Sequence, residues 1–294
     1  HWNDSSDSGV VTQMPSLGYY ASTSGDILEH HLRMAESAGL DFFLFNLHMD
    51  GNGVAQAELE AFSLMLERTT WLHSPVKLCI QLCLYDCPEA DLTRLCDALQ
   101  TSAFIHPNYL QCNGKPLLSV FWTGQYDGDA AFLNQLRKHA GAATLLASSL
   151  RMYPPHEESS LTFGTFDGWS IFSPLELSAP ERWESVWRAA YAHASAGRQN
   201  LRCFTVSPGY DDTALAATAR QGNPYRRIPR EDGLVYRRMW NAAYSLPQPP
   251  DMVIVSTFNE FHENTHIEPT INAGSFYLEL TRECIQKGKD VWKS

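Results

Sequence analysis

The sequence predicts an α/β protein of the (β/α)8 barrel class. Three observations lead to this prediction: the chain is 294 residues long, short apolar segments alternate with amphipathic ones along it, and no Pro/Gly/Ser-rich linker divides it. Continuous apolar runs are typical of strands buried on both faces, and their alternation with helices indicates a parallel sheet. One barrel domain needs about 250 residues. We therefore expect residues 1–294 to form a single domain.

Seven segments have the composition of buried strands, being short, apolar and followed by polar or turn-forming residues. Seven strands leave a (β/α)8 barrel one strand short, and we expect the missing first strand to precede His1. The predicted strands are Asp41–His48, Val76–Tyr85, Pro116–Trp122, Thr144–Leu150, Gly168–Phe172, Leu201–Ser207 and Met252–Phe258.

The segments between most of these strands have helical patterning, with apolar residues repeating every three or four positions. A doubly wound open sheet would show the same alternation, but no GxGxxG motif opens any of the helices. The predicted helices are Asp26–Ala38, Ala55–Leu72, Ala90–Leu99, Ala130–His139, Pro180–Ala196, Gly233–Ala243 and Ser275–Lys287.

Composition and charge exclude several classes of partner. The chain has 22 basic and 33 acidic side chains, for a formal net charge of −11, and no run of Lys or Arg. Nucleic acids and anionic membranes require a positive face, so neither is expected as the main partner. The longest apolar run, Phe42–Leu47, is too short to cross a bilayer. Seven cysteines without a paired CxxC motif indicate mostly free, buried thiols.

Polar residues after the predicted strands are the candidates for a site, because the residues that follow the strands form the catalytic face of a barrel. The densest group follows the last predicted strand, where two carboxylates, an imidazole and an amide lie within five positions. This group is Asn259-Glu260-Phe261-His262-Glu263.

The group permits a zinc-peptidase interpretation, because His262-Glu263-Asn264-Thr265-His266 matches HExxH. That site needs both histidines on one helix face. Here a predicted strand comes just before the motif, Asn264 and Thr265 are poor helix formers, and Pro269 disrupts a helix that continues past it. Zinc is therefore the least favoured alternative, and we expect no metal and no cofactor.

The same group permits glycosidic bond cleavage. This reaction needs one carboxyl group to protonate the leaving oxygen and another to act as base or nucleophile. Two carboxylates held close together have their pKa values pushed apart, which supplies an acid and a base at one pH. Glu260 and Glu263 are the predicted catalytic pair.

The motif closely resembles the signature of glycoside hydrolase family 99, the endo-α-1,2-mannosidases and mannanases, written FNEWHEGTQIEP. Further matches occur in the family's order over nearly the whole chain. The matching segments include Phe258–Pro269, His1-Trp2-Asn3, Gly18-Tyr19-Tyr20, Asn113-Gly114-Lys115-Pro116, Phe166-Asp167-Gly168, Pro208-Gly209-Tyr210, Arg230 and Tyr277-Leu278-Glu279-Leu280-Thr281.

The resemblance implies a (β/α)8 barrel that cleaves within an α-mannose-containing oligosaccharide or polysaccharide, with retention and without a metal. By this resemblance Glu260 deprotonates the sugar's own 2-hydroxyl, which forms a 1,2-anhydro sugar, and Glu263 is the general acid/base. Asn259 and His262 are expected to position the pair or the sugar, and Tyr210 to line the cleft.

The departures from the family pattern fall where the substrate is expected. Asn264 replaces a Gly, which removes freedom at positive φ, and Phe261 replaces a Trp. His48 ends a segment where the family has Trp-Tyr, and Gln81-Leu82-Cys83-Leu84-Tyr85 replaces His-x-Glu-Pro-Tyr. We expect His48, Gln81 and Tyr85 to contact substrate. Two alternatives remain: a related barrel attached to polysaccharide biosynthesis, and a non-catalytic glycan-binding barrel.

Overall fold

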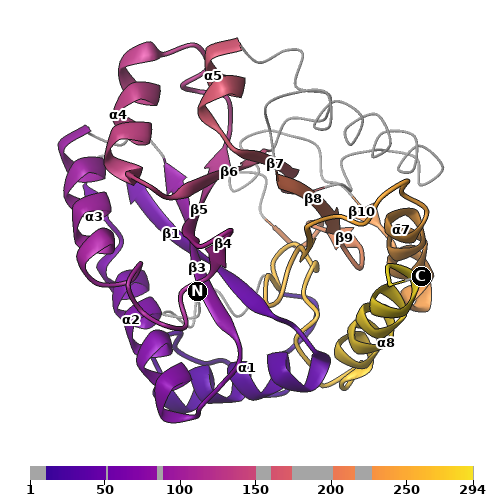
Figure 1. The fold of residues 1–294 in the computed structure, drawn as a ribbon. Coiled ribbons are helices and arrows are strands. Elements are labelled where there is room, and N and C mark those ends of the chain that lie inside the picture. The colour runs from indigo at the N-terminus through magenta and orange to yellow at the C-terminus, as the bar shows by residue number, and fades with distance from the viewer. Residues whose placement is uncertain are drawn as a thin grey trace.

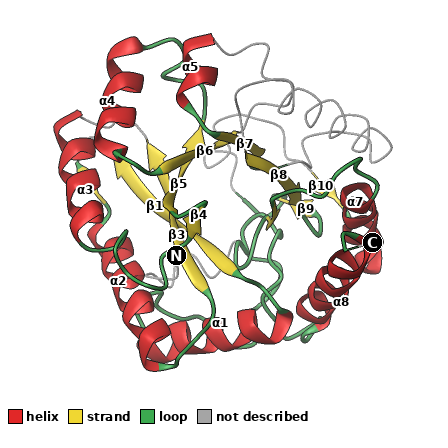
Figure 2. Ribbon diagram, viewed as in Figure 1, coloured by secondary structure: helices red, strands yellow, loops and turns green. Residues whose placement is uncertain are grey.

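The computed structural model describes residues 11–50, 52–84, 89–149, 160–173, 201–215 and 227–293. Within these ranges a curled parallel sheet is surrounded by helices (Figures 1 and 2). All seven predicted strands are confirmed, with ends that differ by a few residues. They are β1 (Phe42–Asp50), β3 (Lys77–Leu84), β5 (Lys115–Trp122), β6 (Thr144–Ser149), β7 (Gly168–Ile171), β8 (Leu201–Val206) and β11 (Met252–Val255).

The strands pair in chain order, β1-β3-β5-β6-β7-β8-β11, and each of these pairs is parallel. The β1–β3 ladder runs from Phe42 opposite Lys77 to Met49 opposite Leu84. Consecutive parallel pairing is the topology of the predicted barrel class. Four short strands in antiparallel pairs were not predicted: β2 (Gly53–Val54), β4 (Gln111–Cys112), β9 (Tyr210–Asp211) and β10 (Arg227–Ile228).

Six predicted helices are confirmed, and the seventh, Pro180–Ala196, lies outside the described residues. α1 ends where Gly39 adopts φ 73°, a conformation that glycine tolerates best. No helix in the described ranges is long and apolar enough to cross a membrane. The confirmed helices are α1 (Gly25–Ala38), α2 (Gln56–Trp71), α3 (Glu89–Thr101), α4 (Ala130–Ala140), α7 (Leu234–Tyr244) and α8 (Phe276–Val291), and α5 (Ser160–Thr165) and the 3-10 helix η4 (Glu231–Gly233) are additional.

The inside of the sheet changes from apolar to polar along the strands. Near the start of β3, Cys79 belongs to a small inner apolar cluster. Two residues later Gln81 is buried, and it stands beside Ser119 of β5. Cys79 and Gln81 share one face because strand side chains alternate. The polar layer therefore lies toward the carboxyl ends of the strands, where a barrel carries its site.

Among the described strands, β1 and β11 end the parallel part of the curled sheet on either side and do not pair with each other, which leaves room there for an eighth strand. Phe43 of β1 contacts Phe258, just after β11, with ring centroids 4.9 Å apart. α1 packs against α2 and α8 (Figure 1). A right-handed crossover through α1 would place the preceding strand beside β1. The strand expected before His1 stays a prediction.

The cysteine prediction is confirmed for the six described thiols, all of which are free. Burial raises the pKa of the Cys79 and Cys83 thiols to about 12. Such thiols stay protonated and unreactive at neutral pH.

Candidate active site

The loop that follows β11 carries both predicted catalytic glutamates, and it closes on itself at its base. Phe258 accepts hydrogen bonds on its carbonyl oxygen from the backbone N–H groups of Ile267, at 2.9 Å, and Glu268, at 2.8 Å. Thr257 and Thr265 pair through both backbone, at 3.0 Å, and hydroxyl groups, at 2.9 Å. These contacts hold residues 259–264 as a turn above the end of the strand.

Arg230 anchors the same loop through its backbone carbonyls. Its guanidinium donates to the backbone carbonyls of Asn264, at 2.7 Å, and His266, at 2.8 Å, and lies over the ring of Tyr277 at 4.3 Å. Burial lowers the pKa of Arg230, and the neighbouring tyrosines partly offset this effect. A buried cation that satisfies backbone carbonyls gives the loop one fixed position.

Asn264, which replaces a family glycine, occupies a position with a positive φ. It adopts φ 52°, a left-handed conformation that asparagine tolerates better than most residues. Its side chain is held on both sides, since its Nδ2 donates to the Asp211 carbonyl at 2.8 Å and its Oδ1 accepts from Thr12 at 2.9 Å. The side-chain contacts therefore stabilise the positive φ.

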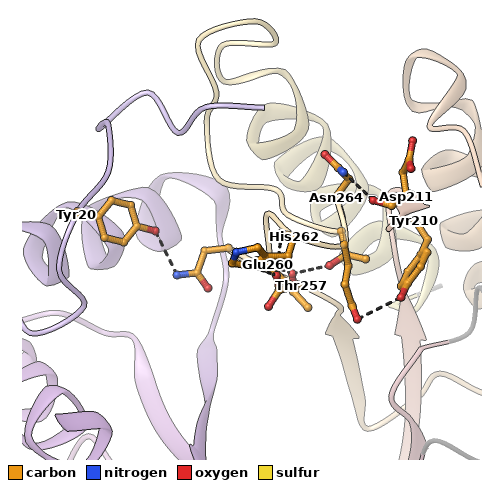
Figure 3. A network of polar contacts seen from close by, with 10 residues as sticks. Tyr20, Tyr210, Asp211, Thr257, Glu260, His262 and Asn264 are labelled. Carbon is orange, nitrogen blue, oxygen red and sulfur yellow. Dashed lines mark hydrogen bonds and ion pairs between the residues drawn. The ribbon is translucent and has the colours of Figure 1, made fainter. Parts of the chain in front are cut away.

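Glu260 is held by its own loop (Figure 3). Its Oε1 accepts a hydrogen bond from the His262 backbone N–H at 2.9 Å and lies 3.2 Å from His262 Nδ1. Its backbone N–H donates to Thr257 Oγ1 at 3.0 Å. The carboxylate has 29% of its side-chain surface exposed, so it is fixed in position and still accessible.

Glu263 is held by a different element. Tyr210, on β9, donates its hydroxyl to Glu263 Oε1 at 3.2 Å, and the backbone N–H of Asp211 donates to the Glu263 carbonyl at 2.8 Å (Figure 3). The short strand β9 therefore docks the second glutamate. The two carboxylates have separate partners, although only two residues lie between them in the sequence.

Most of the predicted site residues line one cavity of about 730 Å³. It extends into the open position between β1 and β11. Tyr210 and His262 are not among the lining residues, but Tyr210 contacts Glu263 and His262 contacts Glu260. Tyr85 lies outside the described residues. The predicted residues that line the cavity are Asn259, Glu260, Glu263, His48 and Gln81.

His48 and Gln81 are both engaged with neighbouring side chains. Glu58 of α2 accepts from the His48 backbone N–H at 2.7 Å and lies 2.8 Å from its Nδ1. Burial by itself raises the pKa of Glu58, but the hydrogen bonds and charge of His48 outweigh burial and lower it. Gln81 donates to Asn46 at 2.8 Å and accepts from Ser119 at 3.0 Å. These contacts fix both side chains along the cavity wall.

The HExxH segment does not form the helix that the zinc alternative requires. Residues 261–264 form turns, and His266 is buried, stacked on Phe261 with centroids 4.2 Å apart. His262 instead faces Glu260. The two histidines therefore do not share a helix face as a zinc-peptidase pair does.

His266 predicts a pH dependence of stability. Burial, and then the charge of Arg230, lower the pKa of His266 well below its ordinary value. The unfolded chain binds a proton below about pH 6.5 that the folded chain excludes, so the free energy of unfolding falls as the pH falls, by about 1.4 kcal/mol per unit for this group.

Urea unfolding between pH 5 and 7 measures this effect. We expect His266→Phe, which keeps a ring against Phe261, to show a shallower decline than the wild type. His30→Gln, at an exposed position, is the control and should keep the wild-type slope. Equal slopes for all three proteins would contradict the assignment.

Sequence reasoning assigned no role to three residues that the structure places in the site. Tyr20 contacts Asn259, and Glu58 holds His48. Thr257 caps the Glu260 backbone. Tyr20 stands in a segment that matched the family, which was a usable signal. Glu58 had none, because it occurs within an ordinary amphipathic helix.

A parallel barrel with two glutamates in one cavity, at the carboxyl end of its last strand, has the arrangement of a glycoside hydrolase. The sequence model of glycosyl hydrolase family 99 matches residues 2–280. The chain therefore belongs to this family of glycoside hydrolases.

Three curated relatives share one name. A glycoprotein endo-alpha-1,2-mannosidase-like protein of Danio rerio is 24% identical over 95% of this chain and 67% of its own length. Proteins of the same name from Mus musculus and Homo sapiens are 31% and 32% identical, over 30% of this chain and 22% of their own length.

Solved structures show the same fold. The GH99 endo-alpha-mannosidase from Bacteroides thetaiotaomicron superposes with a TM-score of 0.74 at 20% identity, over 97% of this chain and 86% of that chain. A structure described as a glycoside hydrolase-like protein gives a TM-score of 0.66 at 19% identity, over 92% and 89%. These similarities confirm the barrel class.

Proposed function

We propose that this protein is a retaining, endo-acting hydrolase of an α-linked, mannose-containing glycan, and that Glu260 and Glu263 carry the reaction. The observation that supports the proposal most is that both carboxylates line the same 730 Å³ cavity while different elements hold them. Separate environments are what divide two carboxyl groups into a base and an acid.

In the first step Glu260 accepts the proton of the sugar's 2-hydroxyl, and the resulting oxygen attacks the anomeric carbon. The bond from that carbon to the leaving oxygen breaks, and Glu263 donates its proton to that oxygen. The products are the shortened glycan and a 1,2-anhydro sugar. An internal hydroxyl thus replaces the enzyme nucleophile of the usual retaining scheme.

In the second step Glu263, now a carboxylate, takes a proton from water, and the water oxygen attacks the anomeric carbon. The bond from that carbon to O2 breaks, and Glu260 returns its proton to O2. Two inversions at one carbon give overall retention, and both glutamates regain their starting protonation states.

The surrounding residues have supporting roles in this proposal. His262 holds one oxygen of Glu260, so the other oxygen is directed to the 2-hydroxyl. Tyr210 holds Glu263 beside the leaving oxygen. His48 and Gln81 lie along the cavity wall and contact the glycan or the water around it. Tyr85 is proposed as a further contact.

Proton NMR of the protein with α-1,2- and α-1,3-linked manno-oligosaccharides, with and without a chelator, tests the proposal. We expect new reducing-end signals that first appear as the α anomer and that persist with the chelator. First appearance of the β anomer would exclude retention. If none of the manno-oligosaccharides gives new signals, the proposal of a mannoside substrate is rejected.

A further inference from the structure

Tyr20 links the loop that follows β11 (residues 259–264) to Glu268, a buried carboxylate that the proposed reaction does not use. Its hydroxyl donates to Glu268 Oε2 at 2.6 Å. It accepts from Asn259 Nδ2 at 3.3 Å, the dashed line that ends on Tyr20 in Figure 3. Asn259 lines the cavity and directly precedes Glu260. Tyr20 comes from the segment before α1, so these contacts join opposite ends of the chain.

Glu268 sets the direction of these hydrogen bonds. Its side chain is fully buried, and its second oxygen lies 3.4 Å from His31 Nε2. A phenol has one hydrogen to donate, and Tyr20 gives it to Glu268. The Tyr20 oxygen can then only accept, so Asn259 must present its amide NH2 group to Tyr20.

This direction decides which end of the Asn259 amide is available to a substrate. The two ends of an amide have nearly the same shape, so packing alone does not choose between them, and a hydrogen-bond network does. With its nitrogen held by Tyr20, Asn259 has its carbonyl oxygen on the other branch of the amide. An oxygen accepts a hydrogen bond from a hydroxyl, which is the polar group that glycans carry most.

We propose that Tyr20 is a positioning residue, which acts through Asn259 and holds its amide so that the carbonyl oxygen accepts a hydrogen bond from a sugar hydroxyl beside Glu260. The inference rests on the proposed function, which supplies the glycan. Tyr20 touches no substrate in this assignment, and Glu268 acts only by taking the Tyr20 hydrogen.

Tyr20→Phe isolates the hydroxyl. The ring of Tyr20 packs edge-on against His31, with centroids 5.2 Å apart, and His31 packs in the same way against Phe258. Phenylalanine keeps these ring contacts and removes the bonds to Glu268 and Asn259. Tyr19→Phe is the matched control, because Tyr19 is the adjacent tyrosine and is 42% exposed.

A double-mutant cycle measures whether Tyr20 acts through Asn259. We expect Tyr20→Phe to lower kcat/KM about tenfold or more, since small misplacements of groups that orient substrate have effects of this size. In the Asn259→Ala background the same change should have less than a twofold effect. An equal loss in both backgrounds, or no loss in the wild type, would overturn the assignment.

A second readout needs no turnover, so it separates failure of this inference from failure of the proposed function. In 1H–15N spectra the Asn259 side-chain amide is identified by its loss in Asn259→Ala. We expect Tyr20→Phe to shift this signal and Tyr19→Phe to leave it in place. An unmoved signal in Tyr20→Phe rejects the positioning role, whatever the NMR panel of glycans shows.

Discussion

Glu263→Gln is expected to lower kcat on unactivated α-mannosides by about 10²- to 10⁴-fold, the usual contribution of a general acid or base. Glutamine has nearly the same shape and still accepts the Tyr210 hydrogen bond through its amide oxygen. It cannot deliver a proton to the leaving oxygen. We therefore expect glycan affinity, measured by calorimetry, to change little while turnover is lost.

Leaving-group dependence makes this test specific to the acid. A substrate with an activated leaving group needs no proton in the first step, so its bond cleavage should be less sensitive to Glu263→Gln than that of a natural glycan. Glu283→Gln is the control, because it removes one exposed carboxylate that pairs with Arg237, and it should leave turnover unchanged. Full activity of Glu263→Gln on unactivated glycans would show that the acid is another group.

Arg230→Met is expected to have the largest effect on stability, lowering the free energy of unfolding by about 3 kcal/mol or more. Methionine fills part of the volume but donates no hydrogen bond, so it leaves the buried carbonyls of Asn264 and His266 without the donor that holds them. Each buried group left in this way costs about 1–3 kcal/mol. Urea unfolding at constant pH measures the change.

The same variant should also lose activity in conditions where it remains folded, because Arg230 anchors the loop that carries both glutamates. The control is Arg237→Met. Arg237 lies on the exposed face of α7, and both Arg237 and its ion-pair partner Glu283 are exposed. Exposed pairs contribute about 0–1 kcal/mol. If the two variants were equally stable, the anchoring role of Arg230 would be wrong.

The strands could be predicted because their signal is local. Segments such as Lys77–Leu84 are apolar at nearly every position, which is what a strand covered on both faces requires. The short strands β9 and β10 have no such signal. They pair only two residues each, and β9 makes its further contacts with Glu263 and Asn264, which are far away in the sequence.

Glu260 and Glu263 could be chosen as the proposed catalytic pair for a similar reason, since they lie three positions apart at the end of a recognisable strand. Their environments could not. Tyr210 is 53 residues from Glu263, and Tyr20 is 239 residues from Asn259. No local pattern reports a contact between residues so far apart in the chain.

Asn264 shows the limit of reasoning from residue type alone. Its replacement of glycine removes freedom at positive φ, yet Asn264 adopts a positive φ in the structure, with contacts from Thr12 and Asp211. Those two residues come from distant parts of the chain. A side chain that is unfavourable in isolation can therefore be stabilised by neighbours that only the fold supplies.

The sequence by itself determined the order of strands and helices and the barrel class, and it singled out Glu260 and Glu263 as the proposed pair, because these depend on hydrophobic periodicity and on residues close together in the chain. Only the tertiary structure decided which partner holds each carboxylate, which end of Asn259 is available, and that His262 and His266 do not share a helix face. These features depend on hydrogen-bond geometry over a few ångströms between distant segments, and that geometry exists only once the barrel has formed.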